Sequence, residues 1–179
     1  MSSLIASLTR EYRRYKALGE GALAQVGDEH LSRADGDGSN SIAVIVWHVA
    51  GNLQSRFTDF LTADGEKPWR HRDEEFEGRT VTRQQLLDRW EEGWRALFAA
   101  LDRLSDADLH ATVTIRGQGV TVHDALHRSL AHTSYHVGQI VYLAKSFVGE
   151  AAWSSLSIPR GQSDAFNQRM QKPGAEDVR

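Results

Sequence analysis

Residues 122–147, with the sequence VHDALHRSLAHTSYHVGQIVYLAKSF, decide the fold of this chain. Apolar residues recur there at steps of three and four, which is the spacing of an amphipathic helix. Thr121 and Asp124 form a capping-box pattern just before the stretch, and Gly149 follows its end. The pattern therefore predicts one long helix over residues 122–147.

Three more segments have the same spacing. The first covers residues 2–27, and the second runs from a cap among residues 39–41 to about residue 63. The third follows a Thr82–Gln85 capping box and runs to about residue 104. Its predicted core stripe is Leu86, Trp90, Trp94, Leu97 and Leu101. Four long helices without a long strand predict an all-α four-helix bundle.

The connections between these helices differ in character. Residues 35–40 form a turn-rich loop, and residues 64–80 form a long polar loop in which we expect Trp69 to hold the loop to the bundle. Residues 105–120 suggest a short hairpin. Residues 150–168 are too apolar for a free tail, which predicts a C-terminal strap. We expect a single domain over residues 1–170 and a disordered tail over residues 171–179.

Composition excludes several classes of function. The 179 residues suit one domain, and a net charge of −3 with interspersed acids and bases disfavours nucleic-acid binding. The absence of cysteine excludes disulfides and thiolate-based sites. The longest apolar stretch, residues 42–50, is too short to span a membrane, and no signal-peptide pattern is present. We therefore expect a cytoplasmic protein with a small-molecule substrate and no nucleic-acid or membrane partner.

Three histidines suggest a metal site. His132 and His136 are four residues apart on one face of the predicted fourth helix, where two imidazoles can reach one ion. His48 lies in the apolar run 45–50, where an ionisable ring needs a partner. Each feature also has a simpler explanation, a chance pair or a hydrogen-bonded core histidine. Together they form a three-ligand pattern that leaves one coordination position open.

A second histidine pair offers a comparison. His123 and His127 are also four residues apart but lie at a different angle on the helix, so we expect them to face solvent or a partner.

Four polar residues are candidates for binding a substrate. Asn52 and Arg56 follow His48 by one and two turns, and Gln139 follows His136 by three residues. Arg160 lies in the predicted strap, which could fold over the mouth of the site. The simpler interpretations are a polar pair on the helix surface for Asn52 and Arg56, and an ordinary turn around Arg160.

Two stretches resemble a known family. Residues 47–53, WHVAGNL, and residues 132–140, HTSYHVGQI, are together similar to the DinB/YfiT-like superfamily of metal-dependent enzymes. Residues 54–72 and 157–167 look like one bacterial branch of it, known as a domain of unknown function. One departure is that many members read His-His-Arg-Gly-Gln around the last ligand, whereas this chain reads YHVGQ over residues 135–139.

The resemblance implies a four-helix bundle, frequent homodimers, and a divalent ion, typically zinc or nickel, held by three histidines. These positions correspond to His48, His132 and His136. Members with known activity include low-molecular-weight thiol S-transferases, a mycothiol-dependent isomerase and hydrolase-like proteins. The departure around residue 136 retains the ligand histidine. It bears only on whether the thiol substrate of those members carries over to this chain.

Three hypotheses of function follow. The first is a metal-dependent enzyme, a thiol S-transferase with a low-molecular-weight thiol or a hydrolase. The second is a non-catalytic metal-binding stress-response or interaction module, which a fourth protein ligand from His71 or Glu74 would favour. The third is a metal-free bundle with buried histidines.

Overall fold

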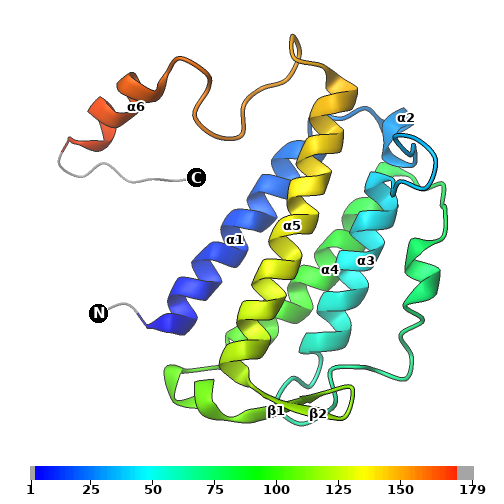
Figure 1. The fold of residues 1–179 in the computed structure, drawn as a ribbon, viewed down its shortest axis with the longest axis vertical. Helices are drawn as coiled ribbons and strands as arrows, with labels where there is room; N and C mark the ends of the chain where they lie inside the picture. Colours follow the sequence, from blue (N-terminus) through cyan, green and yellow to red (C-terminus); the bar gives the residue numbers. More distant parts are fainter. Residues whose placement is uncertain (1–2, 173–179) are drawn as a thin grey trace.

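The computed structural model describes residues 3–172 (Figure 1). Its helices are α1 (Leu4–Leu23), α2 (Asp28–Leu31), α3 (Ile42–Phe57), α4 (Arg83–Leu101), α5 (Val122–Val148) and α6 (Ser163–Met170). The 3-10 helices are η1 (Asp73–Phe76) and η2 (Asp106–His110), and one antiparallel hairpin is formed by β1 (Thr112–Ile115) and β2 (Gln118–Thr121).

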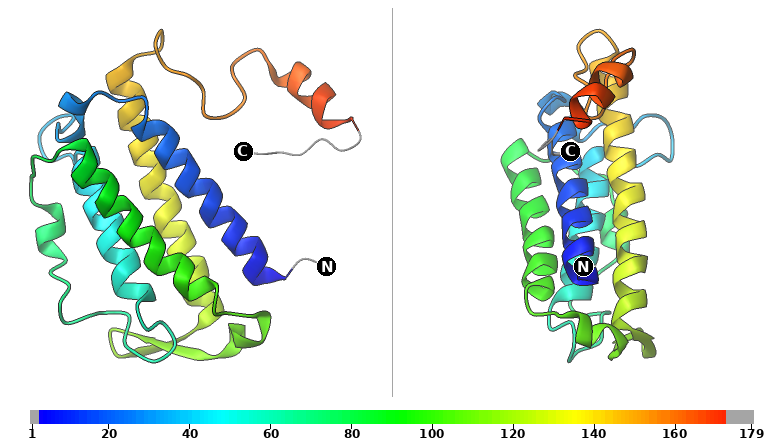
Figure 2. Two further views of the ribbon diagram at one scale, coloured as in Figure 1. Left: turned by 180° about the vertical axis from the view of Figure 1, so that it is seen from behind. Right: turned by 90° about the vertical axis from the view of Figure 1, so that its left-hand side faces the viewer.

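The four long helices α1, α3, α4 and α5 form a bundle (Figures 1 and 2). Helix α3 packs along α4, α1 packs along α5, and α3 also contacts α5. The core stripe predicted for the third helix is confirmed, because all five of its residues are buried. The chain is therefore an all-α bundle, as the sequence predicts.

The predicted helix starts are confirmed at their caps. The Ser41 hydroxyl accepts the Val44 amide at 3.2 Å, and Thr82 with Gln85 forms a reciprocal capping box. The Thr121 hydroxyl accepts the Asp124 amide at 3.0 Å and donates to the Asp124 carboxylate at 2.7 Å. These caps fix where α3, α4 and α5 begin, and so fix which side chains face the interior.

Helix α3 ends earlier than predicted. The sequence suggests an end near residue 63, but the helix stops at Phe57. Asp59 has a positive φ of 49°, which turns the chain back so that the Phe60 ring packs on Phe57 with centroids 5.1 Å apart. The apolar residues after position 57 thus follow helical spacing in the sequence, but in the structure they form a tight turn.

The segment between α3 and α4 is held by charged side chains. Lys67, Arg70 and Glu75 are buried, whereas Trp69 is 51% exposed. The prediction that Trp69 holds this loop to the bundle is therefore wrong. A buried charge is stable only when it is paired, and Arg70 and Glu75 pair with each other. The loop is anchored by ion pairing at the side of α3.

The predicted hairpin is confirmed. Arg116 and Gly117 form its two-residue turn with positive φ values of 55° and 72°, which matches the twist of the strands. The Asp64 carboxylate accepts both turn amides, from Arg116 at 2.9 Å and from Gly117 at 2.8 Å. The hairpin tip is thereby tied to the loop that follows α3.

The C-terminal strap packs only in part. Trp153 and Leu156 pack against the core, and the Gln25 side chain binds the backbone of Ser154. Helix α6 was not predicted; it buries no residue and extends to the side of the bundle in Figure 1 and in the left view of Figure 2. Of the predicted tail, residues 173–179 lie outside the described part of the chain. No helix within residues 3–172 is long and apolar enough to cross a membrane.

Candidate metal centre

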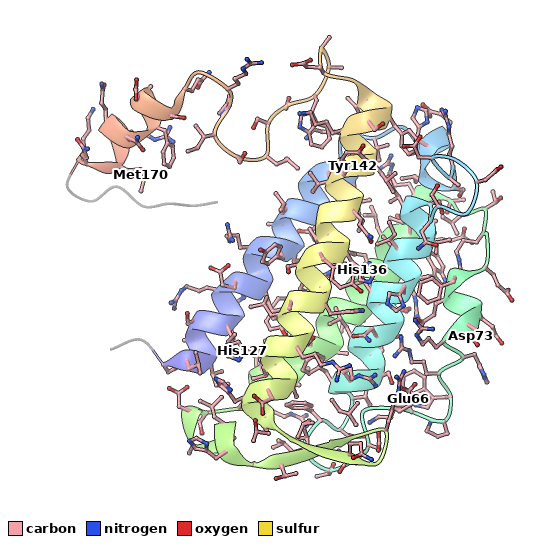
Figure 3. All side chains as sticks on the ribbon, in the orientation of Figure 1. Glu66, Asp73, His127, His136, Tyr142 and Met170 are labelled. Carbon is pink, nitrogen blue, oxygen red and sulfur yellow. The ribbon has the colours of Figure 1, made fainter. Side chains whose placement is uncertain are left out.

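Three histidines meet where α3 faces α5. His48 comes from α3, and His132 and His136 come from consecutive turns of α5 (Figure 3 labels His136). One ring nitrogen from each histidine lies within 4.8 Å of the other two. Within residues 3–172 this is the one group of three or more such side chains that can hold a metal ion. Residues 84 positions apart in sequence thus share one site.

Hydrogen bonds orient two of the rings. The Glu75 carboxylate accepts from His48 Nδ1 at 2.9 Å, and the Gln139 side-chain oxygen accepts from His136 Nδ1 at 2.8 Å. Because these oxygens only accept, each Nδ1 carries a hydrogen, and in the neutral form of each ring Nε2 is the nitrogen that can bind a metal ion. Partners of this kind fix the tautomer and direction of metal-binding histidines.

The free nitrogens fit a shared cation. His136 Nε2 is buried and has no hydrogen-bond partner within the described residues. His48 Nε2 and His132 Nε2 are 3.1 Å apart. Two nitrogen ligands of a tetrahedral zinc ion lie about 3.3 Å apart, given bonds of about 2.0–2.1 Å. The three imidazoles and the spacing of this pair are therefore compatible with a divalent metal ion.

The cavity keeps two of the histidines neutral. Burial, followed by the nearby charges of His136, His48, Arg70 and Arg56, lowers the pKa of His132 to about 3. Burial also lowers the pKa of His136 to about 4, against a raising effect of the Gln139 hydrogen bond. Both rings are neutral at pH 7, which is the form that binds metal.

Glu75 is held as an anion behind His48. Burial raises the pKa of its carboxyl, but hydrogen bonds from Arg70 and His48 outweigh burial, so that the pKa lies below its ordinary value. Arg70 donates from Nε and Nη2 to the two carboxylate oxygens, each at 2.8 Å. The Phe76 ring lies 4.6 Å from the His48 ring. The Arg70–Glu75 pair therefore fixes the position of His48 from the side of the loop.

The histidines open onto a cavity of about 650 Å³. Residues of α3, of the loop after α3, of the hairpin and of α5 line it, and the hairpin lies at the lower end of the bundle in Figure 1. A cavity of this volume accommodates a small organic molecule.

The predicted substrate residues are only partly brought together. Asn52, Arg56 and Gln139 line the cavity with the histidines. Arg56 also donates to the Gly65 carbonyl and to the Glu66 carboxylate. Arg160 is exposed in the strap and is not among the cavity-lining residues, so that the structure does not bring it to the site.

The other histidines stay apart from the centre. His127 is exposed, as predicted, and its ring bonds the backbone oxygen of His123. His71 and Glu74 are also exposed and line a different cleft, so neither supplies a fourth ligand.

Sequence reasoning missed several residues of the site. Arg70 and Glu75 lie in a polar loop without periodicity, where charged residues are normally solvated, so that no local signal marks their burial. Arg72 and Arg116 come from the loop and the hairpin tip. Arg128 was detectable, because it precedes His132 by four residues on the same helix.

Comparisons with known proteins agree with this architecture. Residues 2–162 match the sequence profile of a family described as a protein of unknown function, DUF1572. A crystal structure of a DinB-like protein from Bacillus cereus superposes with a TM-score of 0.60 at 16% identity, covering 82% of this chain and 94% of that one. No curated protein matches the chain. At this identity the likeness establishes the fold alone, whereas the family match spans nearly the whole sequence. The chain therefore belongs to the DUF1572 family and has a DinB-like fold.

Proposed function

We propose that this chain is a metal-dependent enzyme whose His48, His132 and His136 hold one divalent ion beside a substrate cavity. The observation that carries the proposal is the buried Nε2 of His136, which has no partner within residues 3–172, while Nδ1 of the same ring bonds Gln139 and the ligand atoms of the three histidines lie within 4.8 Å of one another. An unpaired buried polar group is costly unless a partner is bound there.

The ion would be zinc or nickel, and in its open position it would lower the pKa of a bound thiol or water. The chain's own groups prepare the site: Glu75 and Gln139 hold two rings in the metal-binding tautomer, and Phe76 covers the His48 ring. Within the described part of the chain, the cavity lining includes no carboxylate that could serve as a general base for hydrolysis. Thiol S-transfer is compatible with such a lining, because a metal-bound thiol needs no base once its pKa is lowered.

The proposal also includes a low-molecular-weight thiol as cosubstrate, a homodimer as the assembly and a cytoplasmic location. A non-catalytic metal-binding module is the alternative. It is less well supported, because a structural zinc site has four protein ligands and only three histidines converge within the described residues.

Cobalt substitution tests the open position. Cobalt(II) added to metal-free protein should give visible absorption, and added cysteine should then produce a sulfur-to-cobalt charge-transfer band in the near ultraviolet. The His132→Ala variant should lose both signals, and His127→Ala should keep both. Cobalt that binds but does not respond to a thiol or to other small ligands would favour the non-catalytic module.

A further inference from the structure

The cavity in front of the three histidines is lined by positive charge. Among residues 3–172, five arginines contribute to its wall and no aspartate or glutamate does; the arginines are Arg56, Arg70, Arg72, Arg116 and Arg128. They come from α3, the following loop, the hairpin tip and α5, so they are separate in sequence and are gathered by the fold.

Neighbouring acids compensate only part of this charge. Glu75 pairs with Arg70, and Glu66 is shared between Arg56 and Arg116 with its carboxylate 3.3 and 2.8 Å away. Arg72 approaches Asp73 at 3.4 Å on the surface. Two carboxylates that serve three guanidinium groups leave an excess positive charge at the wall.

Arg128 has no compensating partner among the described residues. Within residues 3–172 it forms no hydrogen bond and no ion pair, although its position four residues before His132 puts it on the same face of α5. Arginine is suited to oxyanions because its planar group offers several donors in a fixed arrangement. Cavity walls of one charge also concentrate ligands of the opposite charge.

The rest of the wall is apolar. Phe57, Phe60 and Phe76 line the cavity together with Ile115 and Val120. A ligand that fits this lining has an apolar body as well as a charged group.

We propose that the molecule bound here is a small organic anion. Its carboxylate or phosphate group is held by Arg128, with Arg116 and Arg72, and its apolar body lies against the phenylalanines. This inference rests on the proposed function, in that the three histidines are where the bound molecule reacts. The neutral thiols and uncharged esters that would also fit the volume are then poor ligands.

Calorimetric titration of the full chain tests the proposal with three probes of similar shape: benzoate, phenyl phosphate and benzamide. At least one of the two anions should bind about tenfold or more tightly than the neutral amide. Comparison of the two anions shows whether a carboxylate or a phosphate is preferred. Each titration is run on zinc-loaded and on metal-free protein, because a carboxylate can also bind a metal ion directly.

The decisive variant is Arg128→Gln, with Arg95→Gln as the matched control. Arg95 is exposed on α4 and does not line the cavity, so the control removes the same charge from the protein elsewhere. Arg128→Gln should weaken anion binding about tenfold in metal-free protein and leave benzamide unchanged. Arg95→Gln should bind all three probes as the parent does.

The outcomes separate this proposal from the metal site. Anions that bind no better than benzamide, or an unchanged affinity in Arg128→Gln, would overturn the anion proposal even if zinc binds normally. No binding of either anion at millimolar concentration would also overturn it. Arginine-dependent anion binding in a protein that takes up no metal would support the anion proposal while refuting the proposed metal function.

Discussion

Substitution of Gly51 by alanine should disturb the centre without touching a histidine. Gly51 lies inside α3, where its Cα faces the Glu75 side chain. A Cβ placed there would overlap the Glu75 carboxylate, with the carboxyl carbon 2.8 Å away, closer than real Cβ atoms approach other atoms. Glu75 would therefore have to move away from His48 and Arg70.

Two opposed effects set the size of the change. Alanine in place of glycine favours a helix interior by about 0.5–1 kcal/mol. Separating a buried ion pair costs about 3–5 kcal/mol, because Arg70 then keeps an uncompensated charge. Some of that cost is relieved if the loop shifts outward. The net loss in unfolding free energy should be about 2–4 kcal/mol.

Urea unfolding of metal-free protein measures this loss. The matched control is Gly138→Ala in α5, where a Cβ meets nothing within 4 Å. That variant should be more stable than the parent by up to about 1 kcal/mol. Alanine is thus expected to lower the free energy of unfolding at position 51 and to raise it at position 138, although both glycines lie in helices that form the site. If Gly51→Ala were as stable as the parent, the packing of Glu75 against α3 would be refuted.

Three more predictions concern the surroundings of the centre. Glu75→Gln should weaken zinc binding about 10–100-fold in chelator competition, while the exposed neighbour variant Glu74→Gln should not; equal affinities would show that Glu75 does not orient His48. Metal-free protein should lose stability as the pH falls from about 6.5 toward about 4, because His132 and His136 stay neutral when folded but take up protons when unfolded. Urea midpoints at about pH 7.5 and about pH 5 measure this loss, and a midpoint that rises at the lower pH would contradict it. Asp64→Ala should speed hydrogen exchange of the two amides in the hairpin turn about tenfold, and unchanged exchange would show that the loop does not hold the hairpin.

The sequence predicts the bundle well because its signals are local. The spacing of Trp90, Trp94 and Leu97 and the caps at Ser41 and Thr82 all lie within one helix or at its end. The convergence of the histidines can also be predicted from the sequence. A four-residue spacing puts two rings on one face of a helix, and an apolar run implies that the third histidine is buried.

The structural features that the sequence did not predict share one physical cause, because each is determined by packing between residues far apart in the chain. Glu75 and Arg70 are buried because their loop packs beside α3, and nothing in the loop sequence distinguishes them from solvated charges. The early end of α3 depends on the left-handed turn at Asp59, which lets Phe60 fold back. Helix α6 lacks a buried apolar stripe, so it gave no periodic signal.

The measurement that tests the central claim most directly is the metal content of untagged protein by elemental analysis. It would be made on the parent chain and on the His132→Ala and His127→Ala variants after loading with zinc or nickel. The account predicts about one ion per chain in the parent and in His127→Ala, and almost none in His132→Ala. No bound ion in the parent, or an equal loss in both variants, would contradict a three-histidine metal centre.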